Sequence, residues 1–87
     1  MAYVYILESK RNGKYYVGSS MDYEARVKEH LSGKVYTTKR MLPIKLAFKQ
    51  KYPTMYEAKQ VERKLKSFKR HDILEKIIKD GAIKYQR

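Results

Sequence analysis

The 87-residue sequence has no cysteine, only two histidines and no long apolar segment. Without cysteine, neither disulfide bonds nor thiolate metal sites can reinforce the fold. The two histidines, His30 and His71, are too few for a histidine-rich zinc site. No apolar run approaches the roughly 20 residues that a membrane-spanning helix needs, and the N-terminal residues do not resemble a secretory signal. The sequence therefore predicts a cytoplasmic protein without a membrane partner.

The chain has the length of one small domain. Such a domain buries only about 60% of the surface that its unfolded chain exposes, so its core is modest. No linker, repeat or low-complexity segment divides the sequence. We expect a single domain over residues 1–80 and a short basic tail over residues 81–87.

Acidic residues are scarce relative to basic ones. Lys and Arg number 21 against 9 Asp and Glu, which gives a net charge of +12. Residues 1–38 hold 6 basic and 4 acidic groups, whereas residues 39–87 hold 15 and 5. A surface of this kind attracts polyanions, and nucleic acid is the most common polyanion in a cell. The charge favours nucleic acid over two alternatives, a solvated lysine-rich surface and a membrane-surface patch.

Turn and capping residues divide the chain into six regular segments. Asn12-Gly13 predicts a β-hairpin turn, Asp22 an N-cap, and Pro43 the absence of a helix in a basic, irregular loop over residues 34–45. The strands are expected at residues 3–8, 14–18 and 44–52, and the helices at residues 23–31, 55–68 and 72–79. The order β-β-α-β-α-α predicts an α/β fold in which helices flank a small three-stranded antiparallel or mixed sheet.

Two tyrosines lie on the neighbouring strands of the predicted hairpin. Tyr5 and Tyr16 could each be ordinary packing residues, because aromatic side chains favour strands. Together they can share one small site, and Gly18 permits a close backbone approach beside them. The alternative for Gly18 is that it only ends the strand.

Three charged or titratable residues on helices extend this set. Arg26 and His30 are four apart on one helix face, where an arginine can grip a phosphate with its planar donors. Glu62 falls inside the apolar stripe of its helix and so needs a partner, such as a metal ion or an arginine. The alternatives are a surface arginine with a partly buried histidine, and a Glu62 that lies at the stripe's edge or pairs with Arg26.

Together these residues resemble the GIY-YIG nuclease superfamily, and most closely its small stand-alone members related to the nuclease domain of the bacterial excision-repair endonuclease. The spacings from Tyr5 to Tyr16, from Tyr16 to Arg26 and from Arg26 to Glu62 are 11, 10 and 36 residues. The matching segments lie between Tyr3 and about Lys69: Val4-Tyr5-Ile6, Tyr16-Val17-Gly18-Ser19-Ser20, Arg26-Val27-Lys28-Glu29-His30, Leu31-Ser32-Gly33-Lys34 and Glu57-Ala58-Lys59-Gln60-Val61-Glu62.

The resemblance implies hydrolysis of DNA phosphodiester bonds with one divalent ion, Mg²⁺ or Mn²⁺. Glu62 would bind the metal, Arg26 would hold the scissile phosphate, and Tyr5 or Tyr16 would take a proton from the attacking water. His30 would orient the tyrosine or contact phosphate. A phenol with its ordinary pKa near 10 is a poor base, so we expect Arg26, a protonated His30 or the metal to lower the pKa of the tyrosine.

The predicted function is thus a DNA endonuclease of weak sequence preference, acting on single-stranded or branched DNA in repair or processing. Backbone contacts are expected from Lys34, Lys39, Arg40 and Lys66, and no small-molecule cofactor is expected. The first motif lacks the family's glycine, and the asparagine that larger members carry downstream of the glutamate is missing, since Asn12 is the one asparagine. This departure leaves open a nucleic-acid-binding module without turnover. A third possibility is an interaction domain whose basic face meets an acidic protein or membrane.

Overall fold

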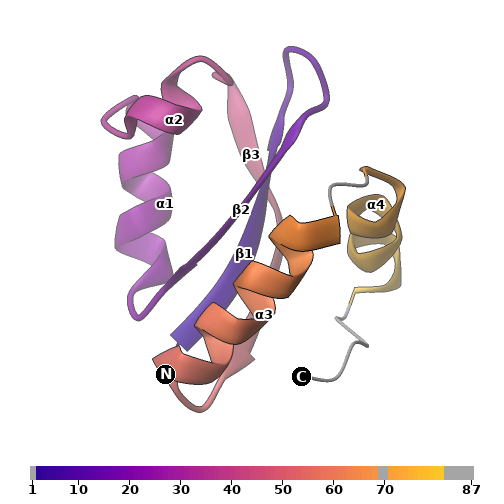
Figure 1. The fold of residues 1–87 in the computed structure, drawn as a ribbon. Coiled ribbons are helices and arrows are strands. Elements are labelled where there is room, and N and C mark those ends of the chain that lie inside the picture. The colour runs from indigo at the N-terminus through magenta and orange to yellow at the C-terminus, as the bar shows by residue number, and fades with distance from the viewer. Residues whose placement is uncertain (1, 69–70, 82–87) are drawn as a thin grey trace.

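A central β-hairpin, extended by a third strand, organises the protein (Figure 1). The computed structural model describes residues 2–68 and 71–81. Its elements are β1 (Ala2–Ser9), β2 (Tyr15–Ser20), α1 (Tyr23–Leu31), α2 (Tyr36–Lys39), β3 (Ile44–Tyr52), α3 (Met55–Phe68) and α4 (His71–Asp80). The strand order is β2-β1-β3 and both pairs are antiparallel. The predicted α/β class is confirmed, with an antiparallel rather than a mixed sheet.

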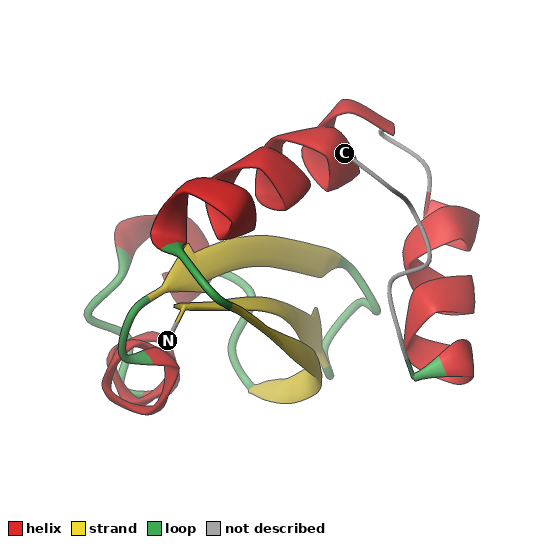
Figure 2. Cartoon of the chain, turned by 90° about the horizontal axis from the view of Figure 1, so that it is seen from below, coloured by secondary structure: helices red, strands yellow, loops and turns green. Residues whose placement is uncertain are grey.

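The helices cover both faces of the sheet (Figure 2). Side chains of β1 alternate between the faces, as a pleated strand requires. Ala2, Val4 and Ile6 pack with α3 and α4, whereas Tyr5 and Leu7 pack against the α1 side. Because β1 is buried on both faces, it fixes the positions of the helices on either side.

Short local signals set the ends of the elements. The Asp22 carboxylate accepts a hydrogen bond from the backbone N–H of Ala25 at 3.2 Å and so caps α1. The Thr54 hydroxyl accepts from the N–H of Glu57 at 3.2 Å in the first turn of α3. Gly33, with φ of 80°, follows the end of α1. The predicted bounds of α1, β3 and α3 are confirmed.

The loop predicted over residues 34–45 instead contains the short helix α2. One turn is too short to give a periodic pattern, and its Tyr-Thr-Thr sequence has low helix propensity. What holds the turn is tertiary: the Thr38 side chain is fully buried and bonds to His30. Of the predicted tail, residues 82–87 lie outside the described residues.

The α3 face of the core generates a stability prediction. Leu65 is 2% exposed, so Leu65→Ala leaves a cavity and should lower the free energy of unfolding by about 2–5 kcal/mol. Leu31 is a matched helical leucine that is 49% exposed, and Leu31→Ala should cost less than about 1 kcal/mol. Urea unfolding of both variants measures the difference. Equal losses would contradict this position of the core.

Candidate active site

Tyr5 lies directly against Gly18 on the neighbouring strand. The two residues are partners in the β1–β2 register. A Cβ atom added to Gly18 would come within 2.6 Å of the Tyr5 hydroxyl oxygen and 2.7 Å of its Cζ. Since Tyr5 is 1% exposed, its ring has little room to move aside. The strand continues past Gly18 to Ser20, so this glycine makes room for the ring and does not end the strand.

A buried hydrogen-bond chain runs from Tyr5 through His30 to Thr38. The Tyr5 hydroxyl lies 3.1 Å from His30 Nε2, and His30 Nδ1 lies 2.7 Å from Thr38 Oγ1. The Thr38 hydroxyl donates to the carbonyl of Val35 at 3.4 Å, which leaves its oxygen free to accept from Nδ1–H. His30 Nε2 is then the acceptor for the Tyr5 O–H. Burial, together with the charge of Arg26, lowers the pKa of His30, so its imidazole is neutral at pH 7.

Arg26 lies one turn before His30 on α1 and close to Tyr5. Its guanidinium donates a hydrogen bond to Glu29 Oε1 at 3.1 Å, and its charge lowers the pKa of Tyr5. The arginine side chain is 42% exposed, so donors remain available on its solvent side. The alternative of an ion pair between Arg26 and Glu62 is wrong, because Glu62 pairs with lysines.

Tyr16 completes the cluster on this face. Its ring centroid lies 5.1 Å from that of His30, and the Tyr5 ring lies 5.8 Å from the same imidazole. Lys66 Nζ lies 5.7 Å from the Tyr16 ring centroid. The two tyrosines therefore border one histidine, as the hairpin predicts.

Glu62 is buried on α3, as its place in the apolar stripe predicts, and is 8% exposed. Its carboxylate accepts from the Ser19 hydroxyl and pairs with Lys66 Nζ at 2.7 Å and Lys59 Nζ at 3.5 Å. Burial raises the pKa of Glu62, but the hydrogen bonds from Lys66 and Ser19 and the two lysine charges outweigh it. The pKa therefore lies below its ordinary value, and the carboxyl is ionised at neutral pH.

These groups lie on opposite faces of the edge strand β2. Gly18 faces the Tyr5 ring on the α1 side, whereas the next residue, Ser19, bonds to Glu62 on the α3 side. Lys66 contacts both halves, through the Glu62 carboxylate and the Tyr16 ring. The candidate site thus wraps around the outer edge of the sheet.

The electrostatics of Tyr5 differ from the expectation. Burial is the main cause that raises the pKa of its phenol to about 12, and Tyr16 adds to the rise. Arg26 lowers the pKa, but by less. The expected net lowering by protein neighbours is therefore wrong, and so is a protonated His30. Both errors have one cause, the low polarity around buried groups.

The residues predicted to bind nucleic acid divide into two groups. Lys66 lies in the site, on Glu62, whereas Lys34, Lys39 and Arg40 are exposed around α2, beyond the end of α1 (Figure 1).

Sequence reasoning missed three further partners in the site. Lys59 lies three residues before Glu62, a spacing that predicts contact on a helix. The alternation of side chains along a strand could have placed Ser19 on the face of β2 that meets Glu62. No sequence pattern could have placed Thr38 beside His30, since a loop separates the two residues.

The raised pKa of Tyr5 predicts a dependence of stability on pH. The unfolded phenol ionises near pH 10 and the folded one near pH 12, so its contribution is complete below pH 10 and is lost as the pH rises to 12. Tyr5→Phe lacks this loss, which approaches about 1.4 kcal/mol per pH unit within that range. Urea unfolding at both pH values, with exposed Tyr36→Phe as control, measures it. The same pH dependence in wild type and Tyr5→Phe would contradict the raised pKa.

Comparison with known proteins agrees with the geometry. The family model described as the GIY-YIG catalytic domain matches residues 1–77. A UPF0213 protein of Streptococcus pneumoniae serotype 4 is 41% identical over 70 residues, which cover 79% of this chain and 70% of that protein. One from Staphylococcus saprophyticus is 34% identical over 80 residues, covering 91% and 95%.

A solved structure shows the same fold. The solution NMR structure of a UPF0213 protein from Bacillus halodurans has a TM-score of 0.57 and 36% identity, and the match covers 93% of this chain and 87% of that one. The family match covers residues 1–77, the range that holds Tyr5, Tyr16, Arg26 and Glu62. The chain therefore belongs to the GIY-YIG family, with a nuclease-type catalytic domain, and is a small member similar to the UPF0213 proteins.

Proposed function

We propose that the protein is a metal-dependent endonuclease that hydrolyses DNA phosphodiester bonds with weak sequence preference, on single-stranded or branched DNA, in repair or processing. The observation that carries the proposal is the convergence of five residues on one sheet edge. Tyr5, Tyr16, Arg26 and His30 meet on one face of β2, and Glu62 lies on the other with Lys66 between. Acid–base groups, a phosphate-binding cation and a carboxylate are what phosphodiester hydrolysis needs.

Arg26 is the phosphate-binding group in this proposal. A guanidinium carries five donors, and here Glu29 takes part of them. The N–H donors that remain on its solvent side can hold two oxygens of the scissile phosphate, and the guanidinium can neutralise charge that develops there. Holding Arg26 against Tyr5 places the phosphate beside the base.

The proton follows the chain from Tyr5 to His30. As the attacking water gives its proton to the Tyr5 oxygen, the phenol proton moves to His30 Nε2, which accepts it because Nδ1–H is bonded to Thr38. The water oxygen forms a bond to phosphorus while the bond to the leaving sugar oxygen breaks, and that oxygen takes a proton from solvent. A relay of this kind suits a phenol whose own pKa is about 12.

Glu62 is the residue that would hold the divalent ion. In residues 2–68 and 71–81, no group of three or more Asp, Glu or His gathers to form a protein cage. One ionised carboxylate fits a hydrated Mg²⁺ or Mn²⁺ that completes its shell with water and phosphate oxygens. When bound, the ion supplies Lewis-acid stabilisation of the phosphate oxygens. Lys66 and Lys59 keep the carboxylate ionised and must yield part of their contact to the ion.

A second candidate function is nucleic-acid binding without turnover. The observations that favour it are the missing downstream asparagine and the carboxylate that two lysines already neutralise. In the described part of the chain, no helix is long and apolar enough to cross a membrane. The cleavage experiment separates this candidate from the nuclease.

Metal-dependent cleavage tests the proposal directly. Wild-type protein should cut labelled single-stranded or branched DNA with Mg²⁺ or Mn²⁺ and not with EDTA. Glu62→Gln and Arg26→Met should each lower the rate by about 100-fold or more, because each removes a charge that the transition state needs. Glu24→Gln, which removes an exposed carboxylate from α1, is the matched control and should cut normally. DNA binding by the wild type without cleavage in either metal would refute the nuclease and favour the second candidate.

The relay predicts a separate effect at Thr38. Thr38→Val removes the acceptor for Nδ1–H, so the imidazole can carry its proton on Nε2 instead, where it can no longer accept from Tyr5. The kcat should then fall roughly 10-fold or more. KM should stay unchanged, because Thr38 is fully buried and does not touch substrate. Thr38→Ser keeps the hydroxyl and should retain most of the rate. If serine lost as much activity as valine, the hydroxyl would have no role in the relay.

A further inference from the structure

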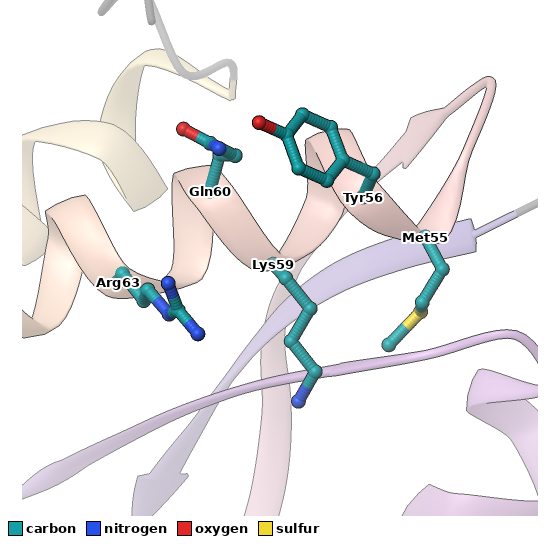
Figure 3. A pocket seen from close by; sticks show the side chains of 5 residues that line it. All are labelled: Met55, Tyr56, Lys59, Gln60 and Arg63. Carbon is teal, nitrogen blue, oxygen red and sulfur yellow. The ribbon is translucent and has the colours of Figure 1, made fainter.

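A second feature of α3 lies outside the five site residues. A pocket of about 290 Å³ opens on the exposed side of the helix. Met55, Tyr56, Lys59, Gln60 and Arg63 line it (Figure 3). The Tyr56 side chain is 72% exposed and belongs to neither core cluster. The lining therefore offers an open aromatic ring, an amide and two cations, with no acidic group.

The pocket adjoins the carboxylate of the candidate active site. Lys59 lines the pocket, and its Nζ lies 3.5 Å from Glu62 Oε1. Tyr56 precedes Glu62 by six residues, which is about 9 Å along the helix axis. A strand whose phosphate lies at Glu62 can therefore continue over Lys59 into the pocket.

The chemistry of the lining suits one kind of occupant. An exposed tyrosine ring stacks on any nucleobase, and Lys59 and Arg63 can neutralise the flanking phosphates. The Gln60 amide has both donors and an acceptor for a base edge, and Gln60 follows Tyr56 by four residues, which places both on one face of α3 (Figure 3). A base inside a duplex is already stacked and paired, so it cannot reach this ring.

We propose that this pocket binds an unpaired nucleotide of the DNA strand next to the cleavage site, with its base on Tyr56. The inference rests on the proposed function and deepens it, because it gives a structural reason for the single-stranded or branched substrate proposed above. Tyr56 is the stacking residue, whereas Lys59 and Arg63 contact phosphates.

Binding in EDTA tests the pocket without any need for cleavage. A labelled thymidine oligonucleotide is compared, by fluorescence anisotropy, with a chain of the same length and charge built from abasic nucleotides. Wild-type protein should prefer the chain with bases. Tyr56→Leu should lower the affinity for the thymidine chain about 5-fold or more and leave the affinity for the abasic chain unchanged. Tyr56→Phe keeps the ring and should keep the preference.

Two controls separate stacking from charge. Tyr36 is about as exposed, at 74%, but lies on α2. Tyr36→Leu should therefore keep the stronger binding of the thymidine chain over the abasic chain. Arg63→Met should reduce the slope of log affinity against log salt by about 0.7, the value for one phosphate contact on a single strand. Tyr56→Leu should leave that slope unchanged, because the substitution removes no cation that could contact a phosphate.

The outcomes also separate the pocket from the nuclease proposal. If Tyr56→Leu weakened binding to both chains equally, or to neither, the pocket would not be a base-binding site, whatever the cleavage result. If the base preference depended on Tyr56 but the wild type did not cleave DNA with either metal, the pocket would be confirmed as a base-binding site and the nuclease proposal would be wrong. If the wild type bound neither chain, the pocket would not be a base-binding site, and the cleavage experiment with Mg²⁺ or Mn²⁺ would still decide the nuclease.

Discussion

The hydrogen bond between the Tyr5 hydroxyl and His30 Nε2 is the contact on which the arrangement of the site depends. It joins the central strand to α1, and both residues are buried, so breaking it would cost two buried side chains a hydrogen bond. Gly18 makes the contact possible by leaving space for the phenol. Arg26, one turn before His30, is brought close to Tyr5 by the helix that this bond anchors.

The edge strand β2 gives the site two environments. On the α1 side the proton-transfer groups are buried, so Tyr5 keeps its proton and His30 stays neutral. On the α3 side the Glu62 carboxylate is ionised and surrounded by lysines with half-exposed side chains. A buried proton-transfer group beside an ionised carboxylate that lysines surround suits a reaction in which water attacks a phosphate held at the strand edge.

Local signals predicted most of the fold, because the hairpin turn at Asn12-Gly13 and the Asp22 cap act over a few residues. The burial of Glu62 could also be predicted, because helical periodicity depends only on the sequence of its own helix. The short helix α2 could not be predicted from local sequence, since the hydrogen bond between Thr38 and His30 that holds it joins residues from separate elements. The pKa directions of Tyr5 and His30 depend on how deeply packing buries each group, which spacing along the chain does not encode.

The protonation state of His30 is decisive, because both the proton relay from Tyr5 and the role of Thr38 depend on it. Side-chain nitrogen NMR of the folded protein at neutral pH measures it directly. The expected result is a neutral imidazole that carries its proton on Nδ1, with Nε2 accepting from Tyr5. An imidazolium, or a neutral ring with its proton on Nε2, would contradict it.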